Sequence, residues 1–330
     1  MSLLCTGTIG IDTVRAPTGK ADKVLGGSCT YFAAAASYYT RVRIVAAVGG
    51  DWPAKHRATL ETFEDVDLRG LEVRPKSKTF AWGGQYAQNM DNRQTLFTEL
   101  GVLAEPPPAV PEKFKDSTHV FLANTHPGVQ LALLEQFPDR VLAVADTMDL
   151  WIKTARPELE TLLGRVDGLV LNYDEAEQFS QVRNPVTAAR LMLDKFGPGA
   201  AMSPKGKPAK APKRRHAGLR FIVVKKGEHG AILVHRKGVA ALPAYPSEAV
   251  VDPTGAGDSF AGGMMGSIVS MGKKLGKDPA SFEVVRAAMA HGTVMASFVI
   301  EAFSLGRLLT LRRREVKSRL QEFERIVRVG

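Results

Sequence analysis

The stretch VDPTGAGDSFAGG, residues 251–263, combines small residues with a carboxylate and an apolar, Gly-rich continuation. We expect a helix to begin within it, so that the backbone amides of Gly255, Ala256 and Gly257 surround a space that an anion can enter. Asp258 would lie in the first helical turn, where it could accept the proton of an attacking hydroxyl while the amides stabilise a phosphoryl group. The alternative is an Asp that caps a helix behind a Gly-rich turn.

Around this stretch, predicted strands alternate with predicted helices. The expected strands include the apolar runs at 43–49, 119–123, 141–146 and 168–172, and two adjacent strands within 221–236 with a Gly-containing turn between them. The expected helices include 31–39, 130–137, 174–180 and 186–196. This alternation predicts an α/β fold with a mostly parallel sheet that is covered by helices on both faces.

Two regions interrupt the alternation. Residues 11–25 have the pattern of a hairpin that turns at 17–19, and residues 71–100 contain strand-like pieces without a helical stripe. We expect these regions to form one small β-sheet that projects from the main body. Because ligands of open α/β sheets bind outside the carboxyl ends of the strands, a sheet projecting there would cover the site.

Composition places the chain among ordinary globular proteins. It has 330 residues, of which 45% are hydrophobic and 24% are charged. The two cysteines, Cys5 and Cys29, form no CxxC pair, so we expect no disulfide, no structural zinc and a reducing, cytoplasmic location. The N-terminal residues lack the basic leader and long apolar run of a signal peptide or membrane anchor, so we expect no membrane partner.

The formal net charge of +10 is concentrated in one segment. Residues 205–220 contain seven Lys or Arg and no acid, and their Pro, Gly and Ala content predicts a flexible basic insertion at 199–219. This insertion either binds a nucleic acid or another polyanion, or serves only as a solubilising loop. Nucleic acid is the less favoured partner, because no aromatic residues interleave with the basic ones to stack on bases.

The segment DPTGAGDSFAGG closely resembles the signature of the PfkB, or ribokinase-like, carbohydrate kinases. The resemblance implies a single ribokinase-like domain over residues 1–330: a three-layer αβα fold with a mostly parallel central sheet and a small β-sheet lid. It also implies ATP and Mg²⁺ as cofactors, Asp258 as the catalytic base and the amides of Gly255, Ala256 and Gly257 as an anion hole. Asp252 matches a position associated with a monovalent cation such as K⁺.

Segments nearer the N-terminus resemble the substrate-binding part of the same family. In GTIGIDTV followed by VLGGS, Asp12 takes the place of an Asp that binds substrate hydroxyls, and Gly26 and Gly27 match the hinge of the lid. Tyr31 stands where many members carry an Asn that contacts substrate, so its ring either stacks on the substrate or fills this space. Further candidates at predicted strand ends are Asn124, Asp146 and Thr147.

The segment FIVVKKGEHGAIL resembles the family's turn beside ATP, where Gly227 and Gly230 match the pattern. Lys225 replaces a common Thr, and is either a cation near the triphosphate or a solvent-exposed side chain. His291 falls on the helix whose counterpart borders the adenine, or else it packs in the core.

Asn172 and Glu175 match the family's N-x-x-E element, which organises Mg²⁺ and the phosphates. The same two residues also have the spacing of a helix-capping box, and both interpretations can hold together.

We expect an ATP-dependent kinase that transfers the γ-phosphate to a hydroxyl of a small polyol, which is a sugar, a nucleoside or a cyclitol. Two alternatives stay open: a nucleic-acid- or polyanion-binding protein that acts through the basic insertion, and a catalytically silent relative. A P-loop kinase and a Rossmann dehydrogenase are excluded, because neither phosphate-binding motif follows a predicted strand. The resemblance also implies a homodimer formed through the lid. Residues 310–327 predict an amphipathic C-terminal helix.

Overall fold

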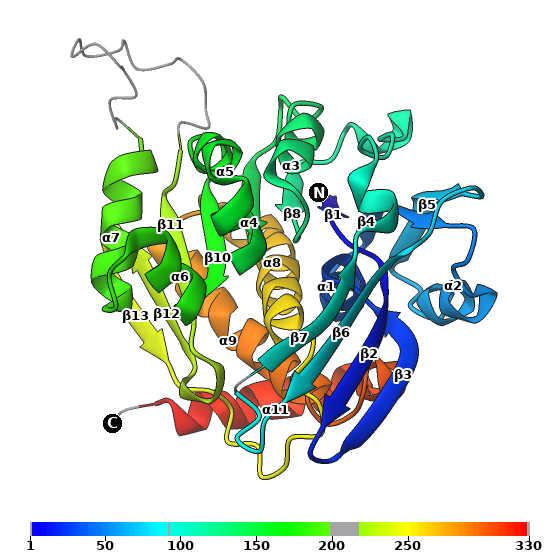
Figure 1. Cartoon of the computed structure of the whole chain (residues 1–330). Coiled ribbons are helices and arrows are strands. Elements are labelled where there is room, and N and C mark those ends of the chain that lie inside the picture. The colour runs from blue at the N-terminus through cyan, green and yellow to red at the C-terminus, as the bar shows by residue number, and fades with distance from the viewer. Residues whose placement is uncertain (1, 92, 199–217, 329–330) are drawn as a thin grey trace.

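Buried apolar runs form the strands of a large central sheet (Figure 1). The structure is a computed structural model, and it describes residues 2–91, 93–198 and 218–328. Within these residues the sheet has nine strands. From one edge to the other they are β13 (Gly238–Leu242), β12 (Ala231–His235), β11 (Phe221–Lys225), β10 (Gly168–Asn172), β9 (Leu142–Asp146), β8 (His119–Leu122), β1 (Leu3–Thr6), β4 (Val42–Gly49) and β5 (Val66–Arg74).

The predicted mostly parallel sheet is confirmed. Neighbouring strands from β5 to β11 all run parallel, and β12 is the one reversed strand of the central sheet within the described residues. The strands β1, β8 and β9 are buried along their whole length, as expected of parallel strands that are covered on both faces. Their carboxyl ends meet at one edge of the sheet, which is where such folds bind ligands.

Helices cover both faces of this sheet and complete the predicted three-layer αβα arrangement (Figure 1). One face carries α1 (Ser28–Ala36), α8 (Ala256–Leu275) and α9 (Phe282–Val299), with α11 (Arg313–Ile326) packed on α9. The opposite face carries α3 (Pro127–Leu134), α4 (Asp149–Thr154), α5 (Arg156–Leu163), α6 (Tyr173–Ser180) and α7 (Pro185–Phe196). Shorter elements are α2 (Ala54–Glu61), α10 (Gly306–Thr310) and the 3₁₀ turns η1 (Gly101–Ala104), η2 (Glu112–Phe114) and η3 (Gly227–His229).

A second, smaller sheet lies beside the central one (Figure 1). Its strands, in spatial order, are β3 (Gly19–Gly26), β2 (Gly10–Ala16), β6 (Phe80–Tyr86) and β7 (Arg93–Glu99). The predicted hairpin at 11–25 forms β2 and β3. The prediction of 71–100 as lid is too long at its start, because 71–74 belong to β5 of the central sheet, where Leu71 is buried opposite Ala46.

Two hydrogen bonds attach the β2–β3 hairpin to loops of the main body. The hydroxyl of Thr18 donates to the carbonyl of Val251 at 2.6 Å. The hydroxyl of Ser304 donates to the carbonyl of Leu25. The small sheet is therefore fixed to the loop that precedes α8 and to the segment that follows α9.

Three other predictions have clear outcomes. The helix expected at 31–39 is α1, which begins at Ser28 because Gly27 is its N-terminal cap. The helix expected at 310–327 is divided between α10 and α11, and α11 buries Val316 and Phe323. The basic insertion expected at 199–219 lies, up to residue 217, outside the described residues.

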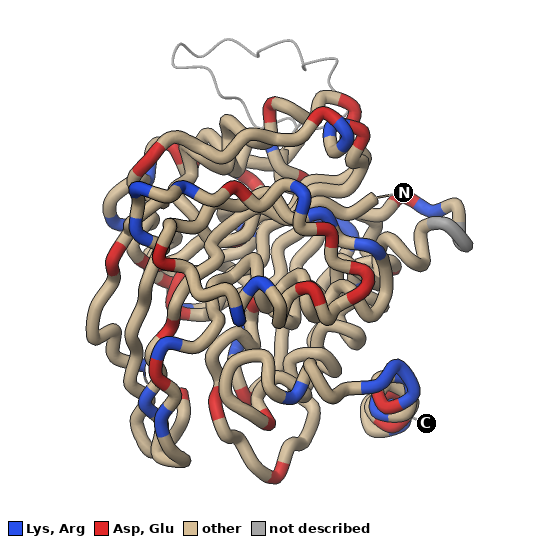
Figure 2. Tube along the Cα trace, turned by 90° about the vertical axis from the view of Figure 1, so that its right-hand side faces the viewer, with Lys and Arg blue, Asp and Glu red and all other residues tan. Residues whose placement is uncertain are grey.

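The described surface carries both signs of charge. Figure 2 shows Lys and Arg interspersed with Asp and Glu along the side that it presents. None of the helices of the described part is long and apolar enough to cross a membrane.

Candidate active site

The stretch 251–263 forms the expected turn into a helix. Gly255 caps α8 with φ 79° and ψ 0°, a left-handed conformation that glycine adopts without strain, and Asp258 lies in the first turn. Ala256 differs from the prediction, because its amide donates to the Pro253 carbonyl at 3.1 Å and closes the turn. The amide of Gly257 has no hydrogen-bond partner among the described residues. This helix start therefore offers fewer free amides than the sequence predicted.

Asp258 lies among other buried charges. Burial raises the pKa of its carboxyl, and the nearby cations of Lys225 and Arg93 oppose that rise. Burial also raises the pKa of Asp146 well above its ordinary range, and the charge of Asp258 adds to the effect. A general base works best when its pKa approaches the working pH, so a raised pKa suits proton removal by Asp258.

Lys225 points at the start of α8. It ends β11, where it pairs with Asn172 of β10. A methyl group added at Gly257 would lie 2.6 Å from the Lys225 Nζ, so the ammonium rests directly against this glycine. The structure therefore places a cation beside the helix start, and the solvent-exposed alternative for this side chain is wrong.

Asn172 and Glu175 form the predicted capping box at the start of α6. The Glu175 amide donates to the Asn172 side chain at 2.8 Å, and the Asn172 amide donates to the Glu175 carboxylate at 2.7 Å. Burial raises the pKa of Glu175 to about 7, against the opposing charge of Lys225. Glu175 is thus buried beside the cation that contacts α8.

The acids near Asp258 fit a hydrated divalent cation. No group of three or more His, Cys, Asp or Glu within the described ranges could hold a metal by itself. Mg²⁺, however, usually takes only one or two carboxylates and completes its shell with waters and phosphates. Asp146, 5% exposed, has a buried Oδ1 without a hydrogen-bond partner, and Glu175 is close enough to influence it.

Asp12 lies against the predicted hinge. A Cβ at Gly26 would fall 1.9 Å from the Asp12 Oδ2, and a Cβ at Gly27, where φ is 93°, would fall 2.5 Å from the Thr8 carbonyl oxygen. Only glycine at both positions lets the carboxylate and the chain approach this closely. Burial raises the pKa of Asp12 to about 7, with the Gly27 amide opposing the rise.

Tyr31 and Asp252 line the same region from two other elements. The ring of Tyr31 packs on Gly255 and is 1% exposed. Asp252 is also 1% exposed; its Oδ1 accepts from the Thr254 amide at 2.9 Å and its Oδ2 has no hydrogen-bond partner. From the small sheet, the hydroxyl of Tyr86 lies 3.1 Å from the Thr254 hydroxyl. The small sheet thus meets the loop before α8 at this point.

Comparison with known proteins agrees with this geometry. The model of the pfkB family carbohydrate kinases matches residues 22–308. The chain belongs to this family. It is also similar to the cytidine kinase of Thermococcus kodakarensis, with 27% identity over 274 residues that cover 80% of this chain and 87% of the relative.

Two solved structures show the same fold as this pfkB family member. The ribokinase of Giardia lamblia superposes with a TM-score of 0.77 at 17% identity, covering 98% of this chain and 99% of that one. A protein from E. coli described as a ribokinase II, in complex with ATP and Mg²⁺, superposes with a TM-score of 0.69 at 18% identity, covering 97% and 99%. Membership makes this chain a phosphotransferase of the ATP-dependent carbohydrate and nucleoside kinase type.

The turn that contains Gly227 and Gly230 has a backbone that favours glycine in this pfkB kinase. Gly227 and Gly230 both have positive φ, at 54° and 85°, around the 3₁₀ turn η3. The tip of the lid reaches this turn, because a Cβ on Gly227 would lie 2.9 Å from the Asp91 Oδ1. The lid and the nucleotide turn are therefore in contact.

The side chains of two predicted residues make contacts with other parts of the protein. The ring of His291 packs edge-on against Tyr39, with centroids 5.2 Å apart, and its backbone lies against Gly263 rather than the start of α8. The side chain of Asn124 is engaged elsewhere, because the indole of Trp151 donates to its Oδ1 at 2.9 Å. For His291 the core-packing alternative is therefore the observed one.

Sequence reasoning missed Arg93, the first residue of β7 in the small sheet. Its guanidinium lies over the ring of Trp82, 5.2 Å from the ring centroid, and its charge lowers the pKa of both Asp258 and Glu175. The one signal in the sequence is a cation within residues 71–100, which the sequence assigns to the lid. A single arginine on a strand gives no indication of which carboxylates it faces.

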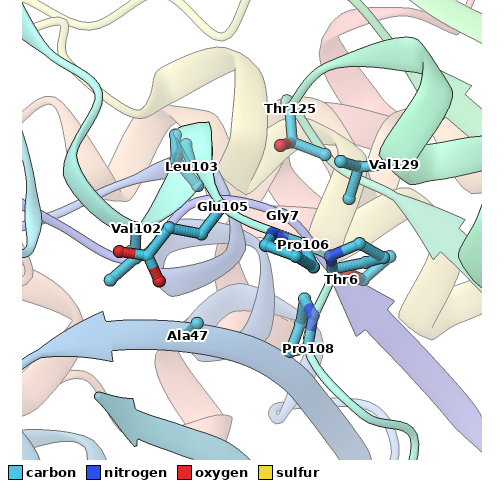
Figure 3. Close-up of a pocket in the computed structure, with 11 residues that line it drawn as sticks. Thr6, Gly7, Ala47, Val102, Leu103, Glu105, Pro106, Pro108, Thr125 and Val129 are labelled. Carbon is cyan, nitrogen blue, oxygen red and sulfur yellow. The ribbon is translucent and has the colours of Figure 1, made fainter. Parts of the chain in front are cut away.

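A small pocket lies apart from these residues (Figure 3). It sits at the carboxyl end of β1, between the segment 102–108 and the start of α3, where Thr6, Gly7 and Thr125 line it. Its volume of about 20 Å³ is enough for one water molecule. It is too small to hold a sugar.

Proposed function

We propose that this chain transfers the γ-phosphate of ATP to a hydroxyl of a small polyol, with Asp258 as the general base. The observation that supports it best is local: the carboxyl of Asp258, the free amide of Gly257 and the ammonium of Lys225 meet at the start of α8. This arrangement combines a base with positive groups for phosphoryl oxygens, which is what phosphoryl transfer to an alcohol requires.

In the proposed reaction, the substrate binds with its hydroxyls near Asp12 and beside Asp258. Asp258 takes the hydroxyl proton as the oxygen forms a bond to the γ-phosphorus, and the bond from that phosphorus to the bridging oxygen breaks to release ADP. The amides of Gly255 and Gly257, together with Lys225, stabilise the charge on the transferred group. Ala256 shapes the turn through its bond to Pro253 rather than donating.

Metal and nucleotide contacts are assigned to residues around this point. Glu175 and Asn172, with Asp146 nearby, would hold a hydrated Mg²⁺, which when bound neutralises charge on the phosphates. The turn with Gly227 and Gly230 would line the nucleotide. We also propose Asp252 as a ligand of a monovalent cation such as K⁺, because its Oδ2 is buried and unpartnered. His291 is left out of the nucleotide site because of its contact with Tyr39.

Among polyols, a nucleoside is favoured over a free sugar or a cyclitol. The similar protein of T. kodakarensis is a cytidine kinase, and it matches 80% of this chain. The amide oxygen of Asn124 already accepts a hydrogen bond from the indole of Trp151. We therefore keep Asn124 only as a residue that acts on the substrate indirectly, through its neighbours.

The lid is proposed both to close over the substrate about Gly26 and Gly27 and to pair two copies of the chain. Closure would exclude water and so limit hydrolysis of ATP. Pairing is supported by β7, an exposed edge strand on which the side chains of Leu96 and Phe97 are 40% and 38% exposed. A cytoplasmic location stays a prediction based on the two free, buried cysteines.

The test is a coupled ADP-release assay with ATP and Mg²⁺ across nucleosides, pentoses, hexoses, ketose phosphates and inositols. The wild-type protein is expected to turn over one class. Asp258→Asn is expected to lower kcat by about 10²–10⁴, with the Kd for ATP changed less than about twofold. Asp194→Asn, an exposed carboxylate on α7, is the matched control.

Two results would contradict the proposal. Near wild-type turnover in Asp258→Asn would remove the assigned base. No turnover of any acceptor would favour the catalytically silent relative. Retention on heparin that is lost when residues 203–216 are deleted would favour the polyanion-binding alternative.

A further inference from the structure

The C-terminal helix α11 has no part in the site described so far. It follows residue 308, where the match to the family model ends, and it packs on α9 (Figure 1). Its buried apolar side chains are Val316 and Phe323. Arg319 lies on the same side of the helix, and its side chain is only 18% exposed. A cation on the packed side of a helix is stable only when it is paired, so its partners matter.

Arg319 is held by four neighbours. Its guanidinium lies over the ring of Phe298, 3.6 Å from the ring centroid, and over the ring of Tyr245 at 4.9 Å. Its Nη1 lies 2.7 Å from the Glu301 Oε1 and donates to the Ser297 hydroxyl at 3.1 Å. A guanidinium is planar and weakly hydrated, so it can stack on rings and bind a carboxylate at the same time. Arg319 therefore joins α9 and the residues after it to Tyr245.

Tyr245 belongs to the segment 243–251, which connects two ends of the proposed site. The segment starts against the turn proposed to line the nucleotide, because a Cβ on Gly230 would fall 2.7 Å from the Ala244 amide nitrogen. It ends immediately ahead of Asp252 and of the turn into α8. The conformation of this segment therefore sets how the nucleotide turn lies relative to the catalytic turn.

The segment 243–251 has few backbone hydrogen bonds of its own. It forms neither a helix nor a strand, and its two prolines have no amide hydrogen. In the part of the chain that the structure describes, its amides make two backbone hydrogen bonds, from Ser247 to Tyr245 and from Val251 to Ile300, each of 2.8 Å. Its shape therefore depends on side-chain contacts, and Tyr245 is its one aromatic residue.

The helix α11 holds Tyr245 at a second point. Glu322 lies three residues after Arg319, on the same side of the helix. Its carboxylate accepts a hydrogen bond from the Tyr245 hydroxyl at 2.9 Å. The ring and the hydroxyl of Tyr245 are therefore both fixed by α11.

Arg319 also supports the end of the segment through Glu301. This acid directly follows Ile300, whose carbonyl accepts from the amides of Val251 and Asp252 at 2.8 Å and 3.3 Å. One side chain on α11 thus contacts the middle of the segment and the residue next to its anchoring point.

We propose that Arg319 is a positioning residue for ATP binding, which acts by holding Tyr245 and thereby the segment 243–251. This inference rests on the proposed kinase function. The printed contacts of Arg319 are with protein groups, so its effect reaches the nucleotide through the segment.

Arg319→Met removes the guanidinium and keeps an unbranched apolar stem against α9. The Kd for ATP with Mg²⁺ should rise about 3- to 10-fold, because the stacking on Tyr245 is lost. The kcat and the KM for the acceptor should change less than about twofold, whereas a variant that merely folds poorly would lose kcat. Arg325→Met is the matched control, because the Arg325 guanidinium is exposed and donates to the Gln321 carbonyl of its own helix at 3.2 Å.

Two more variants test the route through Tyr245. Tyr245→Ala should also raise the Kd for ATP, and the double variant with Arg319→Met should bind ATP no more weakly than Tyr245→Ala alone. Arg319→Lys keeps a cation beside Glu301 and should bind ATP more tightly than Arg319→Met does. If Arg319→Met does not fold, Arg319→Lys and Tyr245→Ala decide by the same criteria.

Isothermal titration calorimetry on the full chain gives the Kd for ATP, ADP release gives the kinetic constants, and urea unfolding reports folding. An unchanged Kd in Arg319→Met, or in the variants that replace it, would overturn the role of Arg319 and leave the kinase function standing. Multiplying effects in the double variant would overturn the route through Tyr245. Absence of ATP binding and of turnover in the wild type would overturn the proposed function, and this inference with it.

Discussion

Gly255 and Gly257 stand two positions apart at the start of α8, yet the structure predicts opposite consequences for the same substitution. In Gly255→Ala the new methyl group would lie 2.3 Å from a ring that is 1% exposed, and the residue would keep a φ of 79°. The left-handed conformation costs a non-glycine residue about 1–2 kcal/mol, and overpacking in a filled core costs about 1–3 kcal/mol. We therefore expect the free energy of unfolding to fall by about 2–5 kcal/mol.

Gly257→Ala meets a different neighbour. Its methyl group would lie 2.6 Å from the Nζ of Lys225, the free end of a long side chain that can move aside. Alanine is also favoured over glycine within a helix by about 1 kcal/mol. The free energy of unfolding should therefore stay unchanged or rise by up to about 1 kcal/mol. Activity should still fall at least about tenfold, because the methyl displaces the ammonium from the free amide.

Urea denaturation followed by far-UV circular dichroism gives the two unfolding free energies, and ADP release gives the two activities. The reasoning is refuted if Gly255→Ala unfolds within about 0.5 kcal/mol of wild type, the ordinary range for a surface change. It is equally refuted if Gly257→Ala loses as much stability as Gly255→Ala, since that would mean that Lys225 cannot move.

Two further predictions concern charge. Lys225→Met removes the foremost cation that lowers the pKa of Asp258, so the acidic limb of the kcat–pH profile should move to higher pH. Lys226→Met is the control, because the Lys226 ammonium lies over the ring of Tyr173, and it should leave the profile in place. Equal shifts in both variants would contradict this. Burial raises the pKa of Asp12 from 3.8 to about 7, so the folded state binds this proton more tightly than the unfolded state does, and the free energy of unfolding should fall as pH rises through this window. Urea titrations of the ligand-free protein across that range should show a slope that Asp12→Asn reduces by up to about 1.4 kcal/mol per pH unit, and an unchanged slope would exclude Asp12 as its source.

The sequence was most informative where structure is decided locally. The turn into α8 and the place of Asp258 in its first turn follow from a run of small residues before an apolar helix, and the capping box of Asn172 and Glu175 follows from their spacing. The alternation of apolar runs likewise predicted the parallel sheet.

Contacts between distant segments were not accessible in the same way. The sequence placed His291 on a helix correctly, but it could not tell that the ring would face Tyr39. From the sequence alone, the side chain of Lys225 could face either side of the sheet at the end of its strand. The position of α8 decides which side it faces, and the sequence does not give that position. Arg93 lowers the pKa of Asp258 from the small sheet. The residue pattern of neither segment indicates that these two side chains lie near each other.

The bond from Thr18 to Val251 joins the hairpin to the loop that leads into α8, and the bond from Ser304 to Leu25 joins it to the segment that follows α9. A hairpin bonded in this way moves together with these two segments, so closure about Gly26 and Gly27 also displaces the loop residue immediately ahead of Asp252. Engineering that shortens or stiffens the hairpin to admit bulkier acceptors will therefore also strain the loop that leads into α8, unless both hydrogen bonds are rebuilt.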